Sequence, residues 1–293
     1  MLLLDKPIGL TSNAVLQQVR RLFRARKAGH TGSLDPLASG MLPICFGHAT
    51  KLSAYLLDAN KTYRVTARFG ARTDTADADG QIVEESPVTR VDREALETAM
   101  SGLRGEILQV PPMYSALKKD GKRLYELARA GQEVERKARP VTIHEFEIET
   151  WDPRQPVMRV RCSKGTYVRT LVEDLAAAAG TLGHVTALRR SSVDPFPPEG
   201  LVTIAELEAA AAQGTDELDR YLRQMDEAID DWPAVYLNSD QAYYLRHGNP
   251  VHAQAAGDPG LVRLYDADER FFGVGEVLRD GRLAPKRLFL DAG

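Results

Sequence analysis

Cysteine is scarce in this chain, and long apolar runs are missing. The 293 residues include two cysteines, Cys45 and Cys162, which lie far apart in the sequence. This predicts two buried free thiols and excludes a disulfide framework or a zinc-binding cysteine repeat. No stretch of 18 apolar residues occurs, and the N-terminal MLLLDKPIGL carries its charge after its apolar run, the wrong order for a signal peptide. We therefore expect a cytoplasmic protein with no membrane association.

The chain also lacks an excess of basic charge, since its formal net charge is −3. The distribution of charge is uneven. Residues 1–60 hold seven Lys and Arg against three Asp, and 101–140 hold nine against five acids, a net charge of +4 in each. Residues 213–232 have a net charge of −5. Such local basic faces can bind a polyanion on a mildly acidic protein, although solvated charged faces are the common alternative.

Several familiar site motifs are missing as well. There is no G-x-S-x-G elbow of a serine hydrolase and no G-x-x-x-x-G-K-[ST] phosphate loop. The stretch DTADADG resembles a calcium loop, but setting Gly80 at the sixth position puts Thr75 first and Ser86 twelfth, where carboxylates are required. An EF-hand is therefore excluded, and no repeat of 20 to 50 residues indicates a solenoid.

Hydrophobic periodicity predicts a chain of mixed helices and strands. We expect strands over 62–70, 157–162 and 184–190, and helices over 11–23, 51–57, 93–103 and 168–180. Ser12 or Asn13 is expected to cap the first helix, and Tyr63 lies in phase with Val65 on the inward face of its strand.

Two segments differ from the rest in composition. Residues 118–139 are rich in charge with one short helical pattern, typical of an excursion from the core. The acidic stretch 213–232 reads as a helix and connector, and from 233 onward short strands and turns predict a small barrel-like module.

Individual residues in the glycine-rich and polar stretches allow more than one interpretation. Asp35-Pro36 in HTGSLDPLASGMLP fits a type I turn in which the Asp side chain accepts from backbone amides. His30 reads equally as a plain loop histidine, and Leu188 as a core residue of a strand. Tyr167 and Arg169 would share a face if the strand before them continued.

Together, these stretches resemble one family. GHTGSLDPLASGMLP, KTYRV, RTDTADADG, PPMYSALKKDGKRLYELAR, CSKGTYVRTL and HVTALRR occur in the order found in the bacterial tRNA pseudouridine-55 synthases, the TruB family. The resemblance covers essentially the whole chain. It implies an α+β fold with a mixed, largely antiparallel sheet in a catalytic domain over 1–232, a thumb-like insertion at about 118–139, and a PUA-like RNA-binding domain over 233–293.

The resemblance also implies roles for individual residues. Asp35 matches the essential aspartate, acting as the nucleophile or as the base that leads to a glycal-type intermediate, and Arg169 and Tyr63 complete the catalytic set. His30 would insert into the tRNA T-loop in place of the flipped base. The other substrate-binding matches are Lys51, which supports the loop, Asp77, which is linked to the arginine, and Tyr167 and Leu188, which line the uracil pocket.

The implied reaction isomerises uridine 55 in the T-loop of tRNA without a cofactor or a metal. The implied partner is tRNA, held at the T-loop and the acceptor end by a monomer with no protein partner. Two alternatives remain at this point: a non-catalytic RNA-binding or tRNA-folding factor, and a hydrolase that uses Asp35 to release free uracil.

Overall fold

The computed structural model describes residues 1–88, 91–119, 121–253 and 258–289. In chain order the strands are β1 (Leu2–Lys6), β2 (Ala28–His30), β3 (Ala38–Phe46), β4 (Lys61–Phe69), β5 (Ala71–Thr73), β6 (Ile82–Glu85), β7 (Gly105–Gln109), β8 (Lys118–Lys119), β9 (Lys122–Arg123), β10 (Arg139–Thr150), β11 (Val157–Cys162), β12 (Gly183–Val193), β13 (Ala234–Tyr236), β14 (Val251–His252), β15 (Gly260–Tyr265), β16 (Phe271–Val277) and β17 (Arg282–Leu288). The α-helices are α1 (Ser12–Leu22), α2 (Ser53–Asp58), α3 (Arg93–Gly102), α4 (Leu124–Arg129), α5 (Val168–Ala178), α6 (Ile204–Gln213), α7 (Thr215–Asp219) and α8 (Ser239–Arg246), and the 3₁₀ helices are η1 (Gly47–Lys51) and η2 (Asp226–Ile229).

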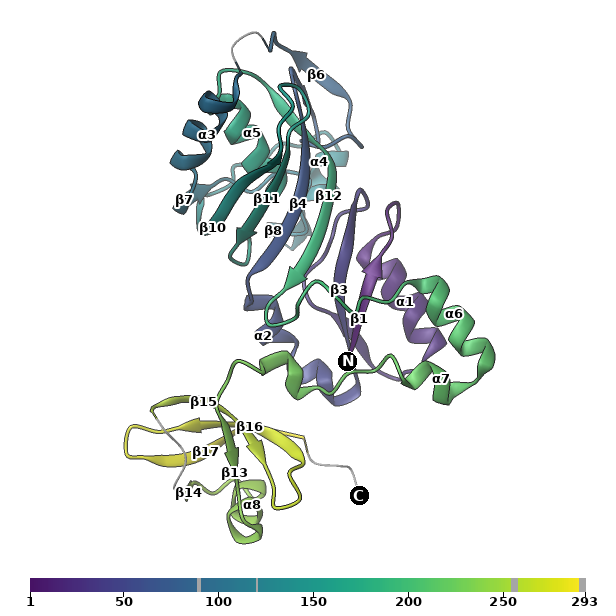
Figure 1. Ribbon diagram of the computed structural model, residues 1–293, viewed down its shortest axis with the longest axis vertical. Helices are drawn as coiled ribbons and strands as arrows, with labels where there is room; N and C mark the ends of the chain where they lie inside the picture. Colours follow the sequence, from purple (N-terminus) through teal and green to yellow (C-terminus); the bar gives the residue numbers. More distant parts are fainter. Residues whose placement is uncertain (89–90, 120, 254–257, 290–293) are drawn as a thin grey trace.

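The larger of the two main sheets has eight strands (Figure 1). Its order is β1-β3-β12-β4-β11-β10-β7, with β2 paired to β3. The β12 and β3 pair is parallel, and the other pairs are antiparallel. The predicted mixed, largely antiparallel sheet is therefore confirmed.

Helices α3 and α5 cover one face of this sheet (Figure 1). Leu171, Val172 and Leu175 of α5 are fully buried against inward residues of the strands. Each such side chain contributes roughly 1.5–3 kcal/mol when it leaves water. The apolar spacing that predicted the helices over 93–103 and 168–180 corresponds to these buried positions, so both helices are confirmed.

The other face of the sheet carries exposed ion pairs. Arg64 on β4 pairs with Glu149, and Arg159 on β11 pairs with both Glu145 and Glu147. Polar side chains therefore alternate with core residues along β4 and β11, as the sequence predicts for half-buried strands.

The strand β1 is buried on both faces, unlike β4. Leu2 and Leu4 pack with α1, α6 and α7, whereas Leu3 packs with Leu52, Leu56 and residues of the C-terminal sheet. No polar residue interrupts the run LLL, because neither face of the strand meets solvent there.

The cap of α1 differs from the prediction. Thr11, not Ser12 or Asn13, occupies the N-cap, and its side chain accepts from Ala14 N at 3.1 Å. Ser12 is buried and bonds the chain near Asp35 instead, so it is unable to serve as the cap.

A five-stranded sheet of order β13-β15-β16-β17-β14 forms the C-terminal region. Its core includes Leu245 of α8, a helix that the sequence reading missed together with α6. Residues 254–257 and 290–293 of the predicted C-terminal module lie outside the described residues.

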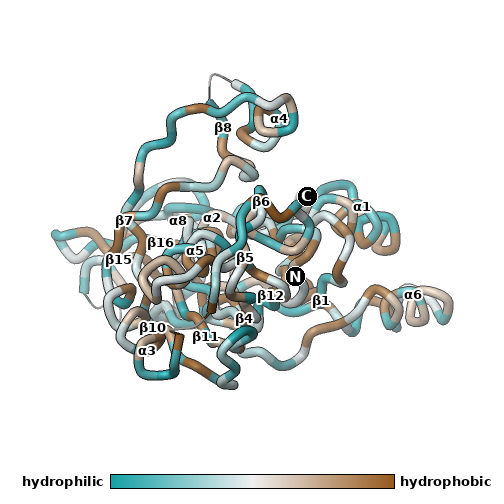
Figure 2. Tube along the Cα trace, turned by 90° about the horizontal axis from the view of Figure 1, so that it is seen from above, coloured by the Kyte–Doolittle hydropathy of each residue, from teal (hydrophilic) through white to brown (hydrophobic). Residues whose placement is uncertain are grey.

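The predicted excursion holds the β8–β9 hairpin and α4, with Asp120 outside the described residues. Figure 2 shows it standing out from the body of the molecule. Among the helices of the described ranges, none is long and apolar enough to cross a membrane.

Candidate functional site

Asp35 lies in the loop that joins β2 to β3. Ala38 N donates to Asp35 O at 3.0 Å, which closes the predicted turn. The Ser12 hydroxyl accepts from Leu34 N at 2.7 Å and donates to Leu34 O at 3.0 Å, and Gly9 N donates to Pro36 O at 2.8 Å. Bonds from the α1 region thus fix the backbone on both sides of the aspartate.

Two glycines shape this loop. Gly32 has φ +81°, and Gly40 has φ +101° with its Cα so close to Arg190 that a Cβ would collide with the Arg190 carbonyl. Glycine is therefore required at Gly40 by both conformation and space.

The Asp35 carboxylate is held by an arginine and not by backbone amides. Arg169 Nε lies 3.0 Å from Asp35 Oδ2, and no amide of the described residues donates to this carboxylate, so the expected amide bonds are wrong. The Arg169 side chain is 6% exposed and that of Asp35 is 45% exposed. One side of the carboxylate is therefore open for a reacting group.

Asp77 and two carbonyls hold the remaining donors of Arg169. Arg169 NH1 lies 3.2 Å from Asp77 Oδ2 and 2.9 Å from Thr75 O, and NH2 donates to Tyr114 O at 2.7 Å. Asp77 itself accepts from the Thr75 hydroxyl at 2.6 Å and from Asp79 N at 3.1 Å. A guanidinium held at all three nitrogens has a fixed position, so Arg169 can orient Asp35.

Two main effects act on the pKa of Asp35. Burial is the larger and raises the pKa of this carboxyl above its ordinary value, while the Arg169 guanidinium acts to lower it. Arg169 thus opposes the protonation that burial favours, and a partly desolvated carboxylate is more reactive than one in water.

Tyr63 and Leu188 adjoin this loop from neighbouring strands. Tyr63 on β4 is half-buried against the same core cluster as Leu34 and Leu37, and burial raises the pKa of its hydroxyl. Leu188 on β12 pairs with Ala38 and is buried in that cluster. Leu188 thus lies beside Ala38, three residues after Asp35, and the charge of Asp35 acts on the Tyr63 hydroxyl.

Tyr167 is the N-cap residue of α5, so the strand before it has ended. The condition under which Tyr167 and Arg169 would share a strand face is therefore not met, because helical geometry begins at Val168. Gln109 of β7 fixes the backbone of Tyr167: the Tyr167 amide donates to Gln109 Oε1 at 2.7 Å, and Gln109 Nε2 donates to the Tyr167 carbonyl at 3.1 Å. Burial raises the pKa of the Tyr167 hydroxyl.

His30 ends β2, five residues before Asp35, and is half-buried. Burial and the charge of Arg190 lower its pKa, so the ring is neutral at neutral pH. Its Nδ1 is buried and has no hydrogen-bond partner among the described residues.

Lys51 is not part of this group. Its ammonium donates to Leu288 O at 3.2 Å and lies 5.7 Å from the Phe289 ring centroid, at the C-terminal sheet. The nine-residue strand β3 separates it from the catalytic loop, a length of roughly 30 Å. The expectation that Lys51 supports the loop is therefore wrong.

Sequence reasoning missed Arg190, which is 1% exposed. Arg190 Nε donates to Met41 O at 2.7 Å and NH2 donates to Gly32 O at 3.0 Å, so one guanidinium joins the two ends of the Asp35 loop. The signal was present in HVTALRR, because Arg190 follows Leu188 at the strand period of two and therefore points to the same side.

Sequence reasoning also missed Lys6 and Lys61. Each occupies an inward-facing position of its strand, and both are buried with their ammonium groups bonded to backbone carbonyls. Burial lowers the pKa of each to about 8.

Three family models match consecutive parts of the chain. "TruB family pseudouridylate synthase (N terminal domain)" matches residues 20–168, "tRNA pseudouridylate synthase B C-terminal domain" matches 169–230, and "Pseudouridine synthase II TruB, C-terminal" matches 233–289. Together they span almost the whole chain.

Curated relatives and solved structures agree with these matches. The tRNA pseudouridine synthase B of Ectopseudomonas mendocina is 54% identical and that of Nitrosococcus oceani 51%, each alignment covering 98% of this chain and 94% of the relative. The fold is similar to one in a crystal structure of a Cbf5-Nop10-Gar1 complex, with a TM-score of 0.77 and 24% identity over 99% of this chain and 84% of that one. The chain therefore belongs to the TruB family of pseudouridylate synthases.

Proposed function

We propose that this chain isomerises uridine to pseudouridine in tRNA, at position 55 of the T-loop, with Asp35 as the residue that acts on the nucleoside. Family membership supports the reaction and the tRNA substrate. The observation that carries the role of Asp35 is its carboxylate, 45% exposed and 3.0 Å from a buried arginine.

The isomerisation breaks the N1–C1′ bond of uridine and forms a C5–C1′ bond, while the proton of C5 is lost and N1 gains one. Asp35 either attacks C1′ directly or removes a proton from the sugar to give a glycal-type intermediate. Both routes need an ionised carboxylate, and Arg169 favours that form. A tyrosine of raised pKa, such as Tyr63, stays protonated and suits stacking on the uracil.

The glycosidic carbon of a stacked uridine is inaccessible, so the nucleotide must leave the stack at a cost of a few kcal/mol. We propose that the neutral ring of His30 fills the vacated space, as aromatic side chains do in RNA loops. Leu188 and Tyr167 would then contact the flipped base, and Asp77 would act through Arg169.

Two further regions would extend the contact with tRNA. The β8–β9 hairpin carries exposed Lys118 and Lys122, and this thumb would close over the RNA. We propose that residues 233–293 form a PUA domain that meets the acceptor end; the exposed Tyr236, Tyr243 and Tyr244 support this role. The proposed unit is a cytoplasmic monomer.

Replacement of Asp35 by Asn tests the proposal. Unmodified tRNA transcript is incubated with purified protein, and pseudouridine is mapped by position. We expect Asp35→Asn to abolish isomerisation while tRNA binding stays near the wild-type level, because the amide keeps the shape but can neither attack nor take a proton. Asp58→Asn is the matched control, since Asp58 is exposed and pairs with Lys164.

Pseudouridine formed at position 55 by Asp35→Asn would disprove the role of this residue. Binding without any isomerisation by the wild type would favour the RNA-binding or tRNA-folding alternative, and release of free uracil would favour the hydrolase.

A further inference from the structure

The helix α1 and the segment after it form a basic surface that the proposed chemistry does not use. Its five cations, Arg20, Arg21, Arg24, Arg26 and Lys27, are all exposed. No ion pair found within the described residues involves any of them. This surface therefore has positive charge available for a polyanion.

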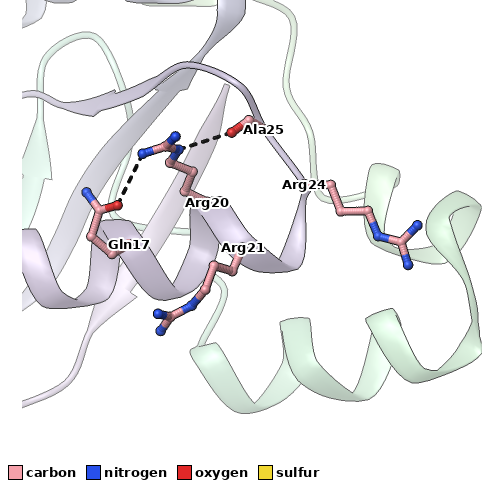
Figure 3. Close-up of a pocket in the computed structure, with 5 residues that line it drawn as sticks. All are labelled: Gln17, Arg20, Arg21, Arg24 and Ala25. Atoms are coloured by element: carbon pink, nitrogen blue, oxygen red, sulfur yellow. Dashed lines mark hydrogen bonds between the residues drawn. The ribbon is translucent and has the colours of Figure 1, made fainter.

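The cations lie at the C-terminal end of the helix. Gln17 and Arg21 are four residues apart on α1, on the side opposite the buried Val15 and Val19, and Arg24 follows just after the helix ends. With Arg20 and Ala25 they line an open hollow of about 450 Å³ (Figure 3).

The arginines of this hollow differ in their bonding. Arg20 Nε donates to Ala25 O at 3.1 Å and NH1 to Gln17 Oε1 at 3.4 Å, so its guanidinium is turned back toward its own segment (Figure 3). Arg21 and Arg24 extend away from these partners. Arg20 thus shapes the hollow, and Arg21 and Arg24, which also line it, have no ion pair or side-chain hydrogen bond among the residues that the structure describes.

The backbone of Arg24 gives an independent reason to assign a role to its side chain. Ala25 N donates to Arg20 O and Arg24 N to Arg21 O, each at 3.0 Å, which is the bond pattern of a Schellman motif. Arg24 stands at its left-handed position with φ +48°, where glycine is strongly favoured. An arginine here lowers the stability of the helix end relative to glycine, which favours a role for its guanidinium outside folding.

The basic surface lies a short distance along the chain from the site around His30 and Asp35. His30 follows Ala25 by five positions, a reach of at most about 18 Å, and α1 packs against β2. Nucleic-acid duplexes carry closely spaced phosphates along their length. An RNA whose loop lies at His30 and Asp35 would therefore bring the phosphates of its adjoining stem within this distance.

We propose that Arg21 and Arg24 bind backbone phosphates of the stem that carries the target loop, a contact that rests on the proposed tRNA substrate. It positions the RNA without reading its sequence. The test measures the Kd for unmodified tRNA, and for an isolated T-arm hairpin, over a series of salt concentrations. The variants are Arg24→Gly alone and Arg21→Gln combined with Arg24→Gly.

Each lost phosphate contact reduces the slope of log K against log salt by about one. We therefore expect a reduction of about one for the single variant and about two for the double variant, with both RNAs. The single-turnover rate at saturating enzyme stays unchanged, because neither residue touches the reacting atoms. The Tm of Arg24→Gly is equal to or above that of the wild type, since glycine suits the left-handed position.

Arg68→Gln is the matched control. Arg68 is exposed on β4, beside strand residues of the face that carries the ion pairs, and is likewise in no ion pair within the described ranges. A wild-type Kd and salt slope for the double variant would overturn the proposal, as would an effect seen with whole tRNA but not with the hairpin. Salt-dependent binding by a wild type that makes no pseudouridine would contradict the proposed function and leave the phosphate contact standing.

Discussion

At the scale of single residues, Arg190 is the group on which the shape of the catalytic loop depends most. Its guanidinium bonds Gly32 O and Met41 O, at the two ends of the segment that presents Asp35. We expect Arg190→Lys to lower kcat by about tenfold with little change in the Kd for tRNA, because an ammonium keeps the charge but not the fork that spans two carbonyls. Single-turnover rates and binding measured separately check this.

The neighbouring Arg189 provides the control for Arg190→Lys. Arg189 pairs with Asp5 through two nitrogens at 2.8 and 2.9 Å and is 44% exposed, so Arg189→Lys should leave kcat unchanged. A wild-type kcat for Arg190→Lys, or an equal loss in both variants, would contradict the positioning role.

The buried lysines Lys6 and Lys61 predict how stability depends on pH. Burial lowers the pKa of each from 10.5 to about 8, so between these values the unfolded chain binds more protons than the folded one. Stability must therefore rise with pH in this range, by about 1 kcal/mol per lysine between pH 8 and 9. Urea unfolding at the two pH values measures the rise.

The two buried cysteines oppose this rise. Burial raises the pKa of Cys45 and Cys162 to about 11 from 9.0, so stability falls as the unfolded thiols ionise, by about 0.3 kcal/mol each between pH 8 and 9 and by more above pH 9. Lys61→Met should remove about half of the rise, whereas Lys27→Met, at an exposed position, should leave it intact. No rise in the wild type would show that the lysines are not buried as charged groups.

At the scale of elements, α5 carries Arg169 but has no side-chain cap of its own. The buried Gln109 of β7 bonds the amide and the carbonyl of Tyr167, so a strand far away in sequence holds the residue at which the helix starts. We expect Gln109→Ala to lower the free energy of unfolding by about 1–3 kcal/mol, because it leaves the Tyr167 amide without its acceptor. It should also lower kcat, since Arg169 follows two residues later.

The exposed Gln224 gives the matched control, because the structure assigns its side chain no bond within the described residues. Gln224→Ala should change neither stability nor kcat. Loss of stability in Gln109→Ala with a wild-type kcat would mean that the start of α5 does not control the position of Arg169.

Helices and strands with regularly spaced apolar residues were predictable from the sequence, and those without such spacing were not. The strand β4 and the helices α3 and α5 each bury one regular face, so their apolar spacing identifies them. The helix α8 buries only Ala242 and Leu245 and exposes two tyrosines, which hides its period. Its capping box, with Asn238 and Gln241 bonded reciprocally, was the readable signal.

The contacts within the site were harder to predict from the sequence than the residues that form it. The residues Asp35, Asp77 and Arg169 could be named from motifs, but their ion pairs join three distant segments and follow only from the packing of α5. The buried cations were missed because a charged residue in a strand is expected to face water. The order of the motifs along the chain gave no information about where Lys51 lies in space. The strand β3 leads away from the catalytic loop, and Lys51 lies beyond its far end.

At the scale of the whole molecule, the two sheets share one core cluster. Val274 and Phe289 of the C-terminal region pack with Met1 and Leu3 of the catalytic region, and Arg223 N donates to Met1 O at 2.7 Å. Loss of the C-terminal sheet would therefore expose one face of β1. We infer that the proposed domains over 1–232 and 233–293 unfold together and not independently.

Phe289→Ala tests this inference, because Phe289 is 6% exposed and lies within the shared cluster. We expect a loss of about 3 kcal/mol in the free energy of unfolding, the usual cost of removing a buried phenylalanine side chain. The two tryptophans report separate places: Trp151 packs against the core of the large sheet and Trp232 against the shared cluster. Trp151→Phe leaves Trp232 as the fluorescent probe, and Trp232→Phe leaves Trp151. Unfolding of the two variants should show the same midpoint, and Phe289→Ala should lower both midpoints equally, because exposure of β1 disrupts the sheet that Trp151 reports. A lower midpoint seen by Trp232 alone would instead establish two independent folding units.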